Sequence, residues 1–301
     1  MDWTLLPILL LAAPSAIPPT HLHTALNGRP RYLDCFLFCL GMQIPLLLDT
    51  LNVGEYPVCA AMTTGEVFRL ENQATVMFLQ KVLRTGHLVT LEVGHGSPAQ
   101  KPRPLMYAPV MALVAAFLFH GTINPYLLGT VLILLLSRLL SIASLRARTW
   151  RPQQGATAPD VQGDLLILLP EDGWIRLKGA VDDLKAVTSG IWLSRRPRHP
   201  RLIDITDWTA RLLVYVAVVV LANASDRAKL LMILCTFMGH GSLVLVNSQA
   251  QELVMHEPTM KISALPGGVK KYSRRSEMVG ELVREVGRSD FAVRLGMMNP
   301  E

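Results

Sequence analysis

Long apolar stretches separated by short polar turns dominate this chain. Tyr126–Leu145 is a run of twenty residues whose only charged side chain is Arg138. Because a helix rises about 1.5 Å per residue, this run is long enough to cross the roughly 30 Å hydrocarbon core of a bilayer. Leu105–Ile123 is almost wholly apolar, and Asn124-Pro125 separates it from the next run. The pattern predicts a first transmembrane hairpin over residues 105–145.

A second pair of apolar runs, Trp208–Ala222 and Ala228–Val246, predicts another hairpin over residues 206–247. Basic residues flank the open ends of both hairpins, while the hairpin tips contain almost none. By the positive-inside rule, the open ends face the cytosol and the tips face the lumen or the exterior. The flanking basic residues are Arg146, Arg148, Arg151, Arg195, Arg196, Arg198, Arg201, Lys270, Lys271, Arg274 and Arg275.

Residues 1–52 contain two shorter apolar segments. Leu5–Ile17 follows Asp2 rather than a positive region, so a cleaved signal peptide, a short span and an interfacial segment all stay open. Leu33–Leu48 is long enough to span if Pro45 only kinks it; a re-entrant or surface helix is the alternative. This region therefore contributes signal-like sequence or one to two spans.

Residues 53–104 are mixed in polarity and rich in glycine, and they predict a polar or mixed loop. Within them, Ala74–Val93 has the composition of an amphipathic or partly buried helix. An extra span is the other interpretation, and it would invert the topology of everything upstream.

Residues 146–205 predict a small cytosolic module. Leu165–Leu169 is a short apolar run, Pro170–Gly173 is a turn signal, and Trp174–Lys178 alternates with period two, which together indicate a β-hairpin. Apolar residues over 181–191 recur at helical spacing, so an amphipathic helix is expected to cover one face of the hairpin. A position in the lipid headgroup region is the alternative for this helix.

Residues 248–301 predict a cytosolic helical tail. Ser276–Val286 carries an apolar stripe, and Gly287 suits a helix C-cap. Ser289-Asp290 is expected to start a short helix through Leu295. Helices of this length are not stable alone, so we expect them to dock on the central hairpin or on a partner protein.

These elements predict a mainly α fold: a transmembrane bundle of about four to six spans with a small β-hairpin and helix module. Hydrophobic residues make up 50 % of the 301 residues, which supports a lipid-embedded chain. The net charge of +6 comes from clusters beside apolar spans, so the expected partner is the bilayer and not nucleic acid. The four cysteines are expected to be buried free thiols.

Few residues are candidates for chemistry. Arg138 and His240 are ionisable groups inside predicted spans, where a charge or polar group is costly unless it is paired or used. For both, structural pairing competes with a ligand-binding or catalytic role; His120, near the end of its span, is expected to be solvated. Asn223 begins a glycosylation acceptor triplet, but its loop is too short for a glycan to be expected. No spacing indicates a metal site or a cofactor.

The soluble residues resemble a group of uncharacterised multi-pass membrane proteins of filamentous fungi, some encoded near specialised-metabolite genes. The resemblance rests on Gly163–Leu166, Glu171–Leu177, Gly179, Gly287–Asp290 and Arg294–Gly296, and covers the second half of the chain. It implies an accessory role in a fungal pathway and no known active site.

We therefore expect an integral membrane protein, without a recognisable catalytic motif, that scaffolds or regulates protein partners through its cytosolic module and tail. The alternative is an intramembrane enzyme or carrier for a lipophilic metabolite, with Arg138 and His240 as polar anchors. Which membrane holds the protein is left open.

Overall fold

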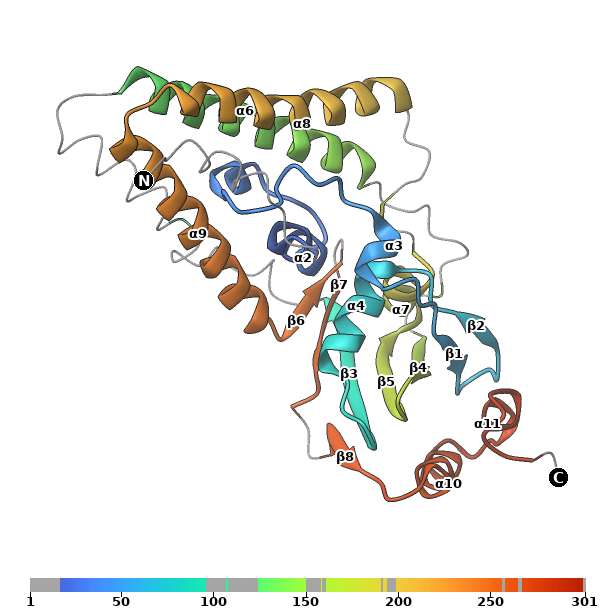
Figure 1. Ribbon diagram of the computed structural model, residues 1–301. Coiled ribbons are helices and arrows are strands. Elements are labelled where there is room, and N and C mark those ends of the chain that lie inside the picture. Colours follow the sequence, from blue (N-terminus) through green and yellow to red (C-terminus); the bar gives the residue numbers. More distant parts are fainter. Residues whose placement is uncertain are drawn as a thin grey trace. The chain divides into compact units, whose positions relative to one another are not determined.

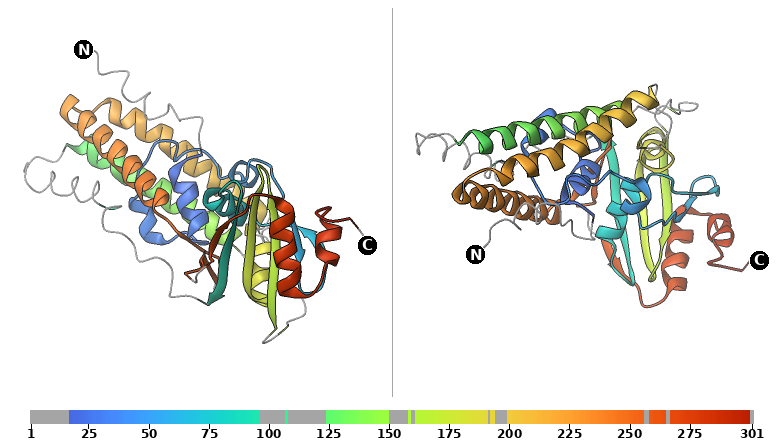
Figure 2. Two further views of the ribbon diagram at one scale, coloured as in Figure 1. Left: turned by 90° about the horizontal axis from the view of Figure 1, so that it is seen from below. Right: turned by 45° about the horizontal axis from the view of Figure 1, so that its top comes forward.

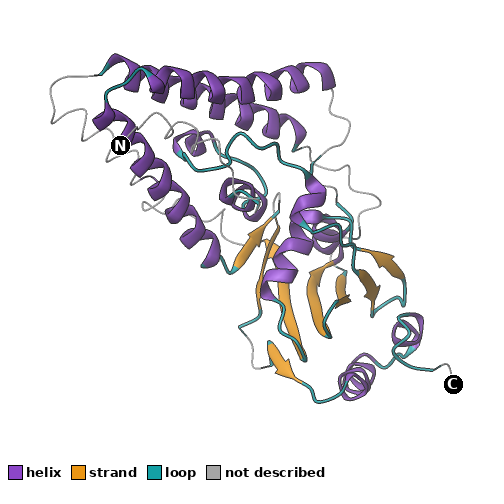
Figure 3. Cartoon of the chain, viewed as in Figure 1, coloured by secondary structure: helices purple, strands orange, loops and turns teal. Residues whose placement is uncertain are grey.

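The computed structural model describes residues 17–95, 107, 124–149, 158, 161–190, 192–193, 199–255, 258–264 and 267–299. The chain divides into two compact units, which we call the helical unit and the sheet unit (Figure 1). The helical unit comprises residues 1–47, 101–150 and 193–250, and the sheet unit comprises 48–100, 151–192 and 251–301. Each unit therefore combines three separate segments of the chain, and strands occur in the sheet unit (Figure 3).

Three helices of the helical unit are long and apolar enough to cross a membrane, as far as the described residues extend. They are α6 (Pro125–Arg148), α8 (Pro200–Ala222) and α9 (Asp226–Ser248), which confirms that three of the predicted apolar runs are helices. Two smaller elements, α2 (Pro19–Leu26) and η2 (Tyr32–Phe36), complete the described part of this unit. Except for residues 17 and 107, the predictions for Leu5–Ile17 and Leu105–Ile123 lie outside the described residues.

α8 packs along its length against α6, and not against α9 (Figures 1 and 2). The two helices run antiparallel: the Ser137 hydroxyl donates to the Ala210 carbonyl at 2.6 Å, and the Thr130 hydroxyl lies 3.5 Å from the Ala217 carbonyl. Small polar residues on the α6 face let the two backbones approach closely, as at many membrane helix interfaces.

The sheet unit overturns the predicted fold class. Its described strands form one eight-stranded mixed sheet in the order β2-β1-β4-β5-β3-β7-β6, with β8 also paired to β3. β3 and β5 are parallel, and the other pairs are antiparallel. The chain is thus a helical unit plus a sheet unit, not a mainly α bundle. The strands are β1 (Val58–Ala61), β2 (Val67–Arg69), β3 (His87–His95), β4 (Gln162–Leu169), β5 (Gly173–Ala180), β6 (Glu252–Val254), β7 (Pro258–Ile262) and β8 (Val269–Lys271).

Part of the error lies in residues 53–104, where a mixed loop was predicted. The helix expected over Ala74–Val93 ends early: α4 covers Gln73–Val82, and β3 begins at His87. The helix ends where Leu83 leaves the helical conformation, and Gly86, with a φ of +72° that favours glycine, forms the turn into β3.

Leu33–Leu48 is likewise not a continuous span. η2 ends at Phe36, and turns follow it before Pro45. The Asp34 carboxylate accepts a hydrogen bond from the Arg31 backbone nitrogen at 2.7 Å, which stabilises a short turn instead of a long helix. The next helix, α3 (Leu48–Leu51), belongs to the sheet unit.

The β-hairpin predicted from Leu165–Lys178 is confirmed as β4 and β5. Glu171 and Asp172 form the turn with φ angles of 62° and 51°. The helix expected after the hairpin is α7 (Val181–Thr188). Helices cover both faces of β4: a Cβ on Gly163 would contact Leu184 of α7, while Leu166 faces the opposite side. Burial of both faces explains the continuous apolar run of β4.

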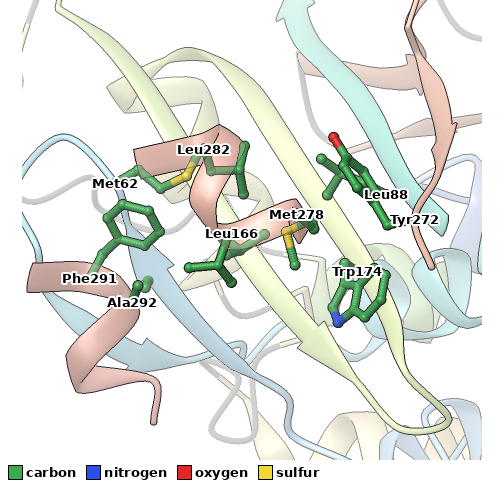
Figure 4. Close-up of a cluster of buried hydrophobic side chains, with 11 residues drawn as sticks. Met62, Leu88, Leu166, Trp174, Tyr272, Met278, Leu282, Phe291 and Ala292 are labelled. Carbon is green, nitrogen blue, oxygen red and sulfur yellow. The ribbon is translucent and has the colours of Figure 1, made fainter. Parts of the chain in front are cut away.

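Two helices of the predicted helical tail are confirmed as α10 (Arg275–Val286) and α11 (Asp290–Arg294), but the first half of that tail is not helical, because it forms β6, β7 and β8. Gly287 caps α10 in the left-handed conformation, with a φ of 75°. Both helices dock inside the sheet unit, where their buried side chains join those of β4, β5 and β3 in one cluster (Figure 4). Its members include Met62, Leu88, Leu166, Trp174, Tyr272, Met278, Leu282, Phe291 and Ala292.

A charged network beside this cluster also ties α10 to the sheet. Arg176 of β5 makes a bidentate contact with Asp164 and donates to Glu285 of α10 at 2.6 Å. Lys178 lies 3.3 Å from the same Glu285 carboxylate. Hydrogen bonds from Arg176, together with the charges of Arg176 and Lys178, lower the pKa of Glu285 to about 2.

This lowered pKa predicts an acid-dependent attachment of α10. A carboxyl whose pKa is lower in the folded state stabilises the fold above its unfolded pKa, and this contribution is lost as the pH falls toward 2. In the full-length protein, we expect Glu285→Gln to speed amide hydrogen exchange in α10 near neutral pH. The difference from wild type should shrink when both proteins are compared at about pH 3. An equal difference at both pH values would contradict the ion-pair explanation.

Candidate binding cavity in the helical unit

α6 places Arg138 near its middle. The helix starts at Asn124, whose side chain accepts hydrogen bonds from the Tyr126 and Leu127 backbone nitrogens at 3.0 and 3.3 Å. Pro125 follows at the first helical position, where its missing N–H costs nothing. This cap fixes the start of the helix. Arg138 lies ten residues before Arg148, the last residue of α6, so the two residues are about 15 Å apart along the helix axis.

The first turns of α8 contribute a polar rim beside the end of α6. Arg148 makes a close ion pair with Asp207 and lies 3.7 Å from Asp204. The Arg211 guanidinium donates to the Asp207 carbonyl at 3.2 Å. Charged side chains of both helices are therefore gathered at this end, while the rest of the α6–α8 interface is apolar or weakly polar.

The described N-terminal segment, residues 17–47, forms the wall that faces α6. α2 is attached to α9, because the Asn247 side-chain amide donates to the Pro19 carbonyl at 2.7 Å. The segment after η2 is held on α9 by a close backbone approach, since Gly239 lies against the Phe38 carbonyl. These contacts bring His21, Thr24 and residues 42–47 opposite α6.

A cavity of about 340 Å³ lies between these walls. Its lining combines apolar side chains with three arginines and two aspartates, so one positive charge is in excess when His21 is left aside. The lining residues are Thr20, His21, Thr24, Met42, Gln43, Ile44, Pro45, Leu46, Leu47, Arg138, Ser141, Leu145, Arg148, Asp204, Asp207, Ala210 and Arg211.

Arg138 is the buried charge of this cavity. Its side chain is 5 % exposed, and its Nε has no hydrogen-bond partner among the described residues. Cys39, Asp34 and Cys35 interact with it electrostatically. Asp34 nevertheless forms no ion pair with Arg138 within the described residues, since its contacts are with the Arg31 backbone and, at 3.9 Å, with His23. A buried guanidinium without a counterion is costly.

Of the two predicted polar anchors, the structure places Arg138 in this cavity but not His240. His240 lies on α9, where its Nδ1 is buried without a partner among the described residues, and it is not part of the cavity lining. His120 lies outside the described residues. Asn223 is the C-cap of α8 and donates to the Val219 carbonyl at 3.0 Å. The four cysteines are buried free thiols, as predicted.

Several cavity residues were missed by the sequence analysis. His21 has no recognisable partner in the sequence, and Asp204 and Asp207 precede Trp208, where the predicted apolar run begins. A signal does exist for the aspartates: Asp204, Asp207 and Arg211 recur at three- and four-residue spacing, so they share one helix face that also carries Ala210. No pattern along the chain indicates that this face meets Arg138.

The described residues contain no group of three or more histidine, cysteine, aspartate or glutamate side chains arranged to hold a metal ion. Comparisons with known proteins give no significant match: no family model, no curated protein and no solved structure resembles the chain. What the cavity binds must therefore follow from its own residues.

Proposed function

We propose that the protein is an integral membrane protein whose helical unit binds a small amphiphilic ligand in the cavity beside α6. The observation that carries the proposal is the cavity itself, which lies against two helices of membrane-spanning length. Its volume of about 340 Å³ is within the range of small-molecule sites. The mixed lining, with mostly apolar residues over 42–47 and a charged rim, suits a ligand with one polar and one apolar end.

The sheet unit supports a defined membrane topology for this proposal. β1–β3, β4–β5 and β6–β8 share one hydrogen-bonded sheet, so the three segments that carry them lie on one side of the bilayer. The chain must therefore cross the bilayer an even number of times between one of these segments and the next. α8 and α9 provide two crossings between the second and third segments. α6 provides one between the first and second, so a second crossing is needed there, and the sequence predicts it over Leu105–Ile123.

This topology predicts where inserted epitopes will be found. Epitopes placed after Gly54, after Thr149 and at the C-terminus should all be accessible from the cytosol, and an epitope after Asn223 should be accessible from the opposite side. Antibody labelling before and after selective permeabilisation of cells measures this. Opposite locations for the Gly54 and Thr149 epitopes would contradict the four-crossing topology.

A cavity-filling substitution tests ligand binding. Ser141 lines the cavity, whereas Ala147 is exposed on the same helix. We expect Ser141→Trp to lower the affinity for the neutral amphiphile decanol by about tenfold or more, because the indole occupies the ligand volume. The matched Ala147→Trp variant should bind decanol like wild type. Binding is measured on purified full-length protein in non-ionic detergent. Equal binding by both tryptophan variants would place decanol outside the cavity and overturn the proposal.

A further inference from the structure

Arg138 gives the cavity a chemical preference that its shape alone does not. The side chain is more than nine-tenths buried, lines the cavity, and leaves Nε without a partner in the described part of the chain. The other two arginines of the lining are engaged at the rim: Arg148 with Asp207 and Asp204, and Arg211 with the Asp207 carbonyl. The excess positive charge therefore lies at Arg138, the most deeply buried cation of the cavity.

We propose that the cavity binds the carboxylate head group of a singly charged amphiphile, with Arg138 as its counterion. This inference rests on the proposed function, since it names the ligand class of the same cavity. A guanidinium presents donors in a planar fork that matches the two oxygens of a carboxylate. One negative charge balances the single excess positive charge, so a monoanion fits better than a dianion.

The rest of the lining suits the hydrocarbon next to such a head group. Met42, Ile44 and Leu145 place apolar side chains on the cavity wall, and Leu46 and Leu47 extend it. Thr20 also lines the cavity, and its hydroxyl, which interacts with the Cys39 thiol, can donate to a ligand oxygen. A buried anion gains more from such donors than it would in water, because the local dielectric is low.

A purely structural role for Arg138 makes a different prediction. If its electrostatic interaction with Asp34 stabilises the ligand-free fold, removal of the charge should lower the melting temperature of the empty protein. If Arg138 awaits an anionic ligand, removal of an unpaired buried charge should leave that melting temperature unchanged or raise it. The stability of the ligand-free protein therefore separates the two roles.

The test compares decanoate with decanol on purified full-length protein in non-ionic detergent. For wild type, decanoate should bind more tightly than decanol and should raise the melting temperature. Arg138→Gln should lower the decanoate affinity by about tenfold or more and leave decanol binding within about twofold, with an unchanged or higher melting temperature when empty. Arg227→Gln is the matched control: Arg227 is an exposed arginine outside the cavity lining, and this variant should bind decanoate like wild type.

Each other result has a distinct meaning. If decanol and decanoate bind wild type and Arg138→Gln equally well, the carboxylate assignment is wrong, although the amphiphile cavity stands. If neither probe binds wild type, water alone fills the cavity and both proposals fail. If dihexanoylphosphatidylglycerol binds more tightly than decanoate and depends on Arg138, a lipid phosphodiester replaces the carboxylate and overturns the assignment. A lower melting temperature of empty Arg138→Gln, without loss of decanoate binding, would overturn it in favour of a structural role.

Discussion

Gly239→Val is expected to prevent the N-terminal segment from packing on α9. A Cβ at this position would lie 2.0 Å from the Phe38 carbonyl oxygen, far inside any permitted contact. The clashing oxygen belongs to the backbone, so it cannot move aside by a change of rotamer as a side-chain atom can. Overpacking of this kind costs about 1–3 kcal/mol and more where the backbone must move. Because α9 holds the wall that faces α6, the variant should lose both stability and the cavity.

Gly241→Val is the matched control for this prediction. Gly241 lies one residue beyond His240 on the same helix, and a Cβ there has no neighbouring atom within 4 Å. Heating each detergent-solubilised variant before size-exclusion chromatography gives its melting temperature. We expect a drop of several degrees or more for Gly239→Val and a value close to wild type for Gly241→Val. Similar melting temperatures for both variants would show that the approach of Phe38 to α9 does not support the fold.

Leu282→Asp is expected to detach the C-terminal helices and to unfold the sheet unit. Leu282 is fully buried between α10 and the sheet, in the cluster with Leu166 and Met278 (Figure 4). Loss of a buried leucine costs about 2–5 kcal/mol, and an unpaired buried carboxylate adds to this cost. Since a folded domain is stable by only about 5–15 kcal/mol, one substitution here is enough to populate the unfolded state.

Ser276→Asp serves as the comparison, because it adds the same charge at an exposed position in the first turn of α10. An acidic residue in the first turn of a helix is mildly stabilising, so this variant should behave like wild type. Limited proteolysis, read out by mass spectrometry, should find new cleavage sites in β4 and β5 for Leu282→Asp only. Protection of β4 and β5 in the Leu282→Asp variant would mean that the sheet is stable without α10.

The elements that sequence reasoning found are those whose signal is local and long. A run of twenty mostly apolar residues identifies α6, and the turn between two apolar strands identifies β4 and β5. β1 and β2 have only four and three residues, too few for a periodicity to be read. β3 is identified as a strand by its parallel pairing with β5, which joins residues far apart in the chain, such as Val93 and Gly179. Such distant pairing leaves no local pattern.

Of the residues that line the cavity, the sequence alone identifies only Arg138 as a candidate. Arg138 is conspicuous because a charge interrupts an apolar span, and this observation needs no knowledge of the fold. His21, Thr24 and Asp207 reach the same cavity from segments far from Arg138 in the chain. His240 was chosen by the same reasoning as Arg138, yet the structure places it outside the cavity lining. An interrupted span indicates a buried polar group, but not its neighbours.

The pairing of β3 has a consequence for biosynthesis. β3 bonds to β5 on one side and to β7 and β8 on the other, and the apolar helices α6, α8 and α9 are translated between these strands. While the ribosome is delivering α8 and α9, β3 has β5 as a neighbour but presents an unpaired edge where β7 and β8 will bind. Open edges of this kind invite aggregation. That edge of β3 is therefore closed only after β7 and β8, which follow α9 in the chain, have emerged from the ribosome.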